Sequence, residues 1–336
     1  MTRFLTAASL LALLAACDNQ QPLNFTGSST VDSSDVVTDG DGEPILDDDG
    51  DTIGVTEDGI PEPIAFNLVD VDYDAVAQTL EVTIQSLDST PISAVYERNA
   101  ALDAPGYVGF SQQEDPLDRF FVGYSQVSGD GDTTGTLVMD GGQFTTFIAG
   151  VNYDQENYTP HQSSQPDNGL VAYTGNYIGI LNFPDADNSL LLQPTTNPPG
   201  SLLPRQPARV TGEVIINADF VDMQINGGVA ERTIIGTSVF PGLPTPLLDI
   251  GFVPSDITEN GTFFGNVQRP DTSVIGNYGG TLGGEQASGV AIGVHLDGDF
   301  ILELEGEEEF GLIVLTKCGL PGDGPFCPDA QPDFVP

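Results

Sequence analysis

The sequence of 336 residues contains no Trp, only 2 His and 3 Cys, and a single Lys, Lys317. Its 8 Lys and Arg stand against 50 Asp and Glu, which gives a formal net charge of −42 at pH 7. Such a chain is repelled by the phosphates of nucleic acids and by bare anionic membranes. The composition therefore excludes a nucleic-acid-binding function, although it names no ligand.

Long hydrophobic runs are also scarce, because beyond the N-terminus none reaches the ~18 residues of a membrane-spanning helix. The N-terminus combines a cation at Arg3, a short apolar stretch over residues 4–13 and a small-residue site that ends in Cys17. This order is typical of a bacterial lipoprotein signal peptide. We predict that residues 1–16 are removed and that a lipid on Cys17 anchors the protein to the outer membrane, at the cell surface. Asp18, directly after it, leaves the periplasmic face of the inner membrane as the alternative.

Basic side chains are absent from residues 17–63, which are rich in Asp, Gly, Ser and Thr. This composition predicts a disordered acidic stalk behind the lipidated cysteine. Within it, Asp47, Asp49 and Asp51 have the alternating spacing of a calcium loop. Thr52 and Asp58, however, stand where such a loop requires Gly and Glu. The pattern is consistent with a weak calcium site and with a merely solvated linker.

Glycine and proline are abundant, with 40 and 25 residues, and they separate short segments rich in Thr, Val and Ile. This pattern predicts an all-β fold with many turns. We expect an N-terminal antiparallel β domain, comparable to a handle, over residues 64–150. Its predicted strands cover residues 64–71, 79–87, 92–98, 107–112, 119–127, 133–139 and 143–149. The last two flank Asp140-Gly-Gly142, which is a strong hairpin signal.

A connector loop is predicted over residues 151–170, and the strand pattern resumes over residues 171–317. The predicted strands here cover residues 172–181, 209–216, 219–225, 232–239, 262–267, 274–281, 289–296 and 311–316. Asn226-Gly-Gly228 is a typical turn between the third and the fourth. Eight antiparallel strands close into a barrel that side chains fill, which removes exposed sheet edges. We therefore expect an eight-stranded antiparallel β-barrel.

The two remaining cysteines, Cys318 and Cys327, form an even pair in an exported chain once Cys17 is lipidated. No further Cys or His lies near them to complete a metal site. A structural disulfide is therefore predicted within the C-terminal tail, residues 318–336.

Groups for nucleophilic or metal chemistry are sparse. The chain has no Gly-x-Ser-x-Gly motif, and no free Cys remains after lipidation and pairing. Its two histidines, His161 and His295, are far apart in sequence, which disfavours a zinc site. The acidic run over residues 305–309 is interpreted as a solvated loop. We expect a protein that is not an enzyme, with a calcium-assisted hydrolase as the less favoured alternative.

Tyr153, Tyr158 and His161 are clustered on the polar connector. Tyrosines on a polar loop suit a ligand-binding surface, because each offers a large area and a hydroxyl group. A plain connector is the alternative interpretation. The same three side chains are the only close set that could ligate haem, although no cofactor is otherwise expected.

Four glycine-containing segments carry a further pattern: Tyr173-Thr-Gly-Asn-Tyr-Ile-Gly179, residues 209–220, Asn260-Gly-Thr-Phe-Phe-Gly265 and Gly279-Gly-Thr-Leu-Gly283. Over residues 170–317 the chain resembles the transferrin-binding protein B-like β-barrel surface lipoproteins, from which it departs over residues 282–289. The resemblance implies a β-rich handle, a barrel, and loops at one barrel end that meet a protein or a solute. It does not imply transferrin, because the matching residues are framework glycines and aromatics.

The lipoprotein signal and the resemblance together predict a noncatalytic surface lipoprotein that binds an extracellular protein or a solute. A structural or assembly lipoprotein of an envelope complex is the alternative.

Overall fold

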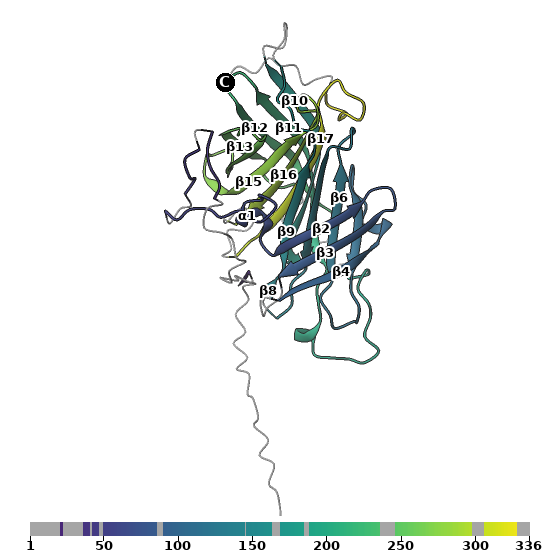
Figure 1. Cartoon of the computed structure of the whole chain (residues 1–336). Helices are drawn as coiled ribbons and strands as arrows, with labels where there is room; N and C mark the ends of the chain where they lie inside the picture. The colour runs from purple at the N-terminus through teal and green to yellow at the C-terminus, as the bar shows by residue number, and fades with distance from the viewer. Residues whose placement is uncertain are drawn as a thin grey trace, which may run out of the picture.

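The computed structural model describes residues 21–22, 36–40, 42–46, 50–85, 90–144, 146–162, 169–184, 188–235, 246–297 and 306–327. In these ranges the chain forms a seven-stranded sheet and a closed barrel, packed side by side (Figure 1). The predictions of an all-β fold and of an eight-stranded antiparallel barrel are confirmed.

The N-terminal unit is one antiparallel sheet. Its strands are bonded in the order β2 (Leu68–Asp74), β3 (Thr79–Gln85), β4 (Pro91–Arg98), β5 (Val108–Gln112), β6 (Phe121–Val127), β7 (Thr133–Asp140) and β9 (Ala149–Gln155). Short elements accompany it: β1 (Gln21–Pro22), which pairs in parallel with β8 (Thr146–Phe147), α1 (Glu62–Ala65) and the 3₁₀ turn η1 (Ala100–Leu102). The sheet curls until its two edges approach each other. Next to these edges, the Asn67 amide donates to the Ala149 carbonyl at 2.9 Å.

The C-terminal unit is the barrel. Its strands are β10 (Leu170–Pro184), β11 (Pro207–Asp219), β12 (Gln224–Ile235), β13 (Ile250–Asp256), β14 (Thr262–Gln268), β15 (Val274–Gly283), β16 (Gly289–Leu296) and β17 (Glu309–Thr316). The barrel closes where β17 pairs with β10, with Leu312 opposite Ile178. The connection from β10 to β11 contains the 3₁₀ turn η2 (Gly200–Leu202) and reaches the N-terminal sheet, where the Leu192 amide donates to the Gln113 side chain at 2.8 Å (Figure 1).

The two units share a hydrophobic core. Along β16, Val290, Ile292 and Val294 fill the barrel, whereas Ala291 faces outward into a second core. This second core contains outward barrel residues such as Leu312 together with side chains of β6, β7 and β9. Because both faces of this part of the barrel wall are covered, β16 is almost continuously apolar.

Part of the expected stalk packs against this shared core. Val37, Ile53 and Ile60 are buried, and backbone bridges connect Val36 with Gly54 and Val55 with Pro61. These apolar residues and backbone bridges hold the described part of the acidic segment against the folded protein.

Two strand predictions in the N-terminal unit are wrong. The predicted strand over residues 64–71 begins instead with α1, on which Ile64 is fully buried, and β2 starts only at Leu68. The hairpin through residues 140–142 does not form, because the partner of β7 is β9, with Met139 opposite Ala149. Asp140 is buried and accepts a hydrogen bond from the Ile148 amide at 2.8 Å, which fixes a longer loop. Val151–Gln155 of the expected connector consequently belong to β9.

In the barrel, the predicted turn at residues 226–228 is also wrong. β12 runs through it as one strand, and β13, which the strand pattern missed, supplies the eighth strand. A Cβ on Gly227 would lie 2.3 Å from the Ile215 carbonyl oxygen, and one on Gly228 would lie 2.6 Å from that of Ile250. These glycines therefore permit close strand contact on both sides of β12.

The predicted disulfide between Cys318 and Cys327 is present, with the two Cα atoms 5.2 Å apart. Its loop lies against β10, where the Thr174 hydroxyl is 3.2 Å from the Cys327 sulfur. A Cβ on Gly324 would lie 1.9 Å from the Thr174 carbonyl oxygen, so only glycine permits this approach. The bridge thus ties the C-terminal segment to the strand that closes the barrel.

Candidate functional site

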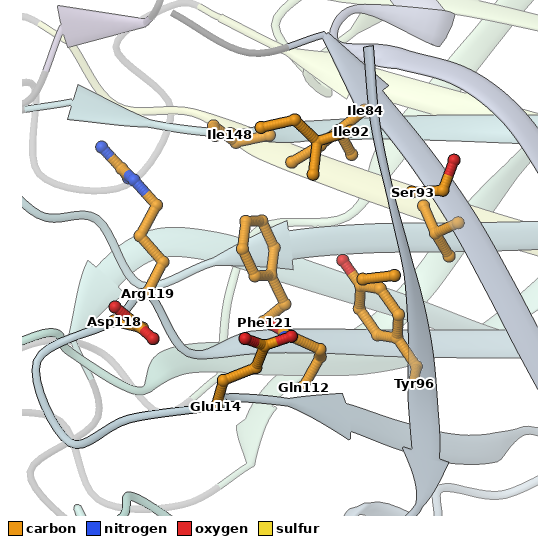
Figure 2. Close-up of a pocket in the computed structure, with 12 residues that line it drawn as sticks. Ile84, Ile92, Ser93, Tyr96, Gln112, Glu114, Asp118, Arg119, Phe121 and Ile148 are labelled. Atoms are coloured by element: carbon orange, nitrogen blue, oxygen red, sulfur yellow. The ribbon is translucent and has the colours of Figure 1, made fainter.

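A pocket of about 580 Å³ opens on the concave face of the N-terminal sheet (Figure 2). Most of its wall is apolar, and the residues that line it are Val82, Ile84, Ile92, Ser93, Ala94, Tyr96, Gln112, Glu114, Asp118, Arg119, Phe121 and Ile148. A volume in this range is typical of sites for small molecules.

Strand alternation explains why the apolar side chains gather there. Val82 pairs with Ala94 and Ile84 with Ile92 in the β3–β4 ladder, so all four project to one face. The next residue, Val95, projects to the other face and is 61% exposed. The curl of the sheet then brings Phe121 and Ile148 opposite the β3–β4 wall (Figure 2).

Tyr96 places a polar atom in this apolar wall. Its side chain is 3% exposed, and its ring packs edge-on against Phe121 with the centroids 6.0 Å apart. The hydroxyl points into the space between Phe121 and the isoleucines (Figure 2). Within the part of the chain that the structure describes, this hydroxyl forms no hydrogen bond. Burial raises the pKa of Tyr96 well above its usual value, so the group stays a neutral hydroxyl.

Arg119 lines the pocket with its stem, while both terminal nitrogens of its guanidinium are bound elsewhere. It pairs with Asp140, donates to the Thr146 hydroxyl at 2.7 Å and donates to the Gln143 carbonyl at 3.2 Å. Figure 2 shows the guanidinium pointing away from the Phe121 ring. Arg119 therefore stabilises the loop after β7 and offers no free charge to a ligand.

Glu114 and Asp118 are the other charged residues of the pocket, and both are exposed. Among the described residues, neither carboxylate has a hydrogen-bond donor or a cationic partner. Both lie along one edge of the pocket (Figure 2). With Arg119 neutralised by Asp140, the charge available to a ligand at this edge is negative.

The structure does not bring Tyr153, Tyr158 and His161 together. Tyr153 is buried in β9 as part of the shared core, whereas Tyr158 packs against the barrel core. His161 contacts Phe220 edge-on, with the ring centroids 5.8 Å apart. Tyr158 also borders a second cavity of about 480 Å³, which Asp132, Asn157, Thr159 and Glu285 complete. Tyr153 therefore belongs to the shared core, whereas Tyr158 and His161 lie beside the barrel core.

The other sequence candidates are placed as follows. Cys17, Asp47 and Asp49 lie outside the described residues, and Asp51 is exposed. In the described ranges, no group of three His, Cys, Asp or Glu side chains is arranged to hold a metal ion. The calcium site in the acidic segment stays a prediction.

The acidic run at residues 305–309 is not a solvated loop in its described part. Glu307, Glu308 and Glu309 are all buried. Glu308 contacts the ring of His295, which stacks on Phe310 at a centroid distance of 4.2 Å. Glu308 and Glu309 can be buried because His295 and Arg232, from other strands, pair with their carboxylates. A local charge pattern does not reveal such distant partners.

Sequence reasoning also missed the pocket. The signal was present in the alternation of Leu80, Val82 and Ile84 with polar residues, which marks one apolar face. The alternation predicts a buried face without stating what covers it. Here the cover is incomplete, and the opening is the pocket.

None of the helices in the described ranges is long and apolar enough to cross a membrane.

No protein-family model matches the chain, and no curated protein matches it. Solved structures with some likeness include the intact Ap-TbpB with N and C lobes, at 10% identity and a TM-score of 0.34 over 72% of this chain and 52% of that chain. A transferrin-binding protein B mutant from Actinobacillus pleuropneumoniae H49 has 14% identity and a TM-score of 0.32 over 75% and 98% of the two chains. A surface lipoprotein has 13% identity and a TM-score of 0.31 over 74% and 96%. The chain spans about half the length of the intact two-lobed protein, and these similarities are loose ones at the level of the fold.

Proposed function

We propose that this protein is a noncatalytic, lipid-anchored binding protein that takes up a small apolar solute in the pocket of its N-terminal sheet. The pocket itself carries the proposal, because its seven apolar or aromatic side chains surround a space that no described residue fills. The Tyr96 hydroxyl supports it, since it faces the pocket without a hydrogen bond to any described residue and so offers a ligand one polar contact in an apolar wall.

A pair of variants tests the pocket. Ala94→Phe places a ring in the pocket, whereas Val95→Phe adds the same ring on the exposed face of the same strand. The neutral fluorescent probe 1-N-phenylnaphthylamine is expected to bind the wild type and Val95→Phe with equal affinity. Ala94→Phe is expected to weaken probe binding, because its ring occupies the space of the probe. Circular dichroism spectra that match the wild type would show that both variants are folded. Equal probe affinity in the Ala94 and Val95 variants would show that the pocket is not the binding site.

The membrane anchor is a second part of the proposal, supported by the order of residues 1–17. Mass spectrometry of the purified protein is expected to show an acylated Cys17 as its first residue. Protease treatment of intact cells is expected to release the folded part, which would place it at the cell surface. An uncut and unacylated N-terminus would remove the anchor from the proposal.

A further inference from the structure

The charges at the edge of the pocket indicate which solutes it accepts, and this inference rests on the proposed binding function. The pocket is lined by three charged side chains, Glu114, Asp118 and Arg119. Arg119 is bound to Asp140 and to the loop after β7, so its charge is already compensated. Glu114 and Asp118 have no such partner among the described residues. A ligand at this edge therefore meets two uncompensated carboxylates.

We propose that the pocket binds amphipathic organic cations, with the apolar body against Phe121 and the β3–β4 wall and the ammonium group beside Glu114 and Asp118. The two carboxylates complement the charge of the ammonium group, and the apolar wall accommodates the hydrocarbon body. The same arrangement disfavours fatty acids, because their carboxylate would face like charges where no free cation is available.

The size of the preference follows from Coulomb's law. Both carboxylates are exposed, so water screens them, and one carboxylate ~5 Å from an ammonium group strengthens binding about fourfold. Two carboxylates, weakened somewhat by salt, give a preference of about tenfold for a cation over a neutral ligand of equal length. An anion of that length is expected to bind about tenfold more weakly than the neutral ligand.

Decylammonium, decanol and decanoate provide matched ten-carbon probes for calorimetric titration. The protein is the full chain carrying Cys17→Ser, so that no attached acyl chain competes for the pocket. In low-salt buffer at pH 7.5, affinity is expected to fall about tenfold at each step from decylammonium to decanol to decanoate. The Glu114→Gln/Asp118→Asn variant is expected to bring the three affinities within about threefold of one another while leaving decanol unchanged.

A control variant separates the pocket from the charge of the whole protein. Glu81→Gln/Glu97→Gln removes two exposed carboxylates from the opposite face of β3 and β4 and should keep the full preference. A preference lost equally in this control would overturn the assignment to Glu114 and Asp118. Equal binding of all three probes to the wild type would overturn the cation specificity and leave the binding function intact. Binding of none of them would overturn both.

Discussion

A buried ion pair inside the barrel offers the sharpest test of the fold. Arg232 on β12 donates to Glu309 on β17 at 2.6 Å, and the two side chains are 1% and 0% exposed. Tyr177 on β10 donates its hydroxyl to the other carboxylate oxygen of Glu309 at 2.5 Å. Burial alone lowers the pKa of Arg232, but the Glu309 charge outweighs it and raises that pKa above its usual value. The pair therefore links strands that are not neighbours in the barrel.

Glu309→Gln leaves the charge of Arg232 buried without a counter-ion. Removal of one partner of a buried pair costs about 3–5 kcal/mol of the free energy of unfolding. Arg232→Met is expected to cost a similar amount, because it isolates the carboxylate. The double variant Arg232→Met/Glu309→Leu replaces the pair by apolar side chains and is expected to remain within about 1 kcal/mol of the wild type or to exceed it.

Urea unfolding followed by circular dichroism measures all three variants, and Glu213→Gln is the control. Glu213 is an exposed glutamate on β11, so its replacement should change the free energy of unfolding by no more than about 0.5 kcal/mol. If Glu309→Gln costs no more than this control, or if the double variant costs the sum of the two single ones, the side chains do not form a buried pair.

Three further predictions concern single contacts, and each is measured by urea unfolding. Replacing both disulfide cysteines by serine is expected to cost about 2.5 kcal/mol and to abolish the effect of reductant. Gly311→Ala would place a Cβ 2.1 Å from the Tyr177 hydroxyl and should cost about 2 kcal/mol, whereas Gly200→Ala meets no atom within 4 Å and should be neutral. Burial raises the pKa of Asp130, but hydrogen bonds from Ser128, Ser288 and the backbone outweigh it and lower that pKa below its usual value. The stabilisation is therefore present above about pH 4 and lost as the pH falls through the lowered pKa, so the destabilisation by Asp130→Asn should be clear at pH 7 and shrink steadily as the pH falls below about 4.

Local patterns predicted the parts of the fold that depend on local chemistry. Strand alternation located the strands that became β3 to β7 and most of the barrel, and the spacing of Cys318 and Cys327 located the disulfide. The errors arose where distant segments decide the outcome. Asn226-Gly-Gly228 has the sequence of a turn, yet it lies within β12. Glycine is needed at position 227 because the carbonyl oxygen of Ile215 on the neighbouring strand approaches too closely for any larger residue.

The candidate site was harder to predict for the same reason. Glu309 follows two other glutamates, so its local sequence predicts a solvent-exposed side chain. Inside the barrel, however, Arg232 balances its charge and the Tyr177 hydroxyl donates a hydrogen bond to it. Tyr153 stands in a polar context, yet its strand pairs with β7 and buries it. The pocket depends on the curl of a whole sheet, which no single segment encodes.

The shared core explains how the pocket keeps its shape. On β6, Val122 and Tyr124 pack into the core shared with the barrel, while Phe121 projects to the opposite face and lines the pocket. Ile148 lines the pocket in the same way between Phe147 and Ala149, which both belong to the shared core. This side of the pocket is therefore fixed by the barrel behind it. The β3–β4 wall has no such support, because its outer face is exposed to solvent. The alternation of side chains thus creates one rigid wall, held by the barrel, and one free-standing wall able to adjust to the body of a ligand.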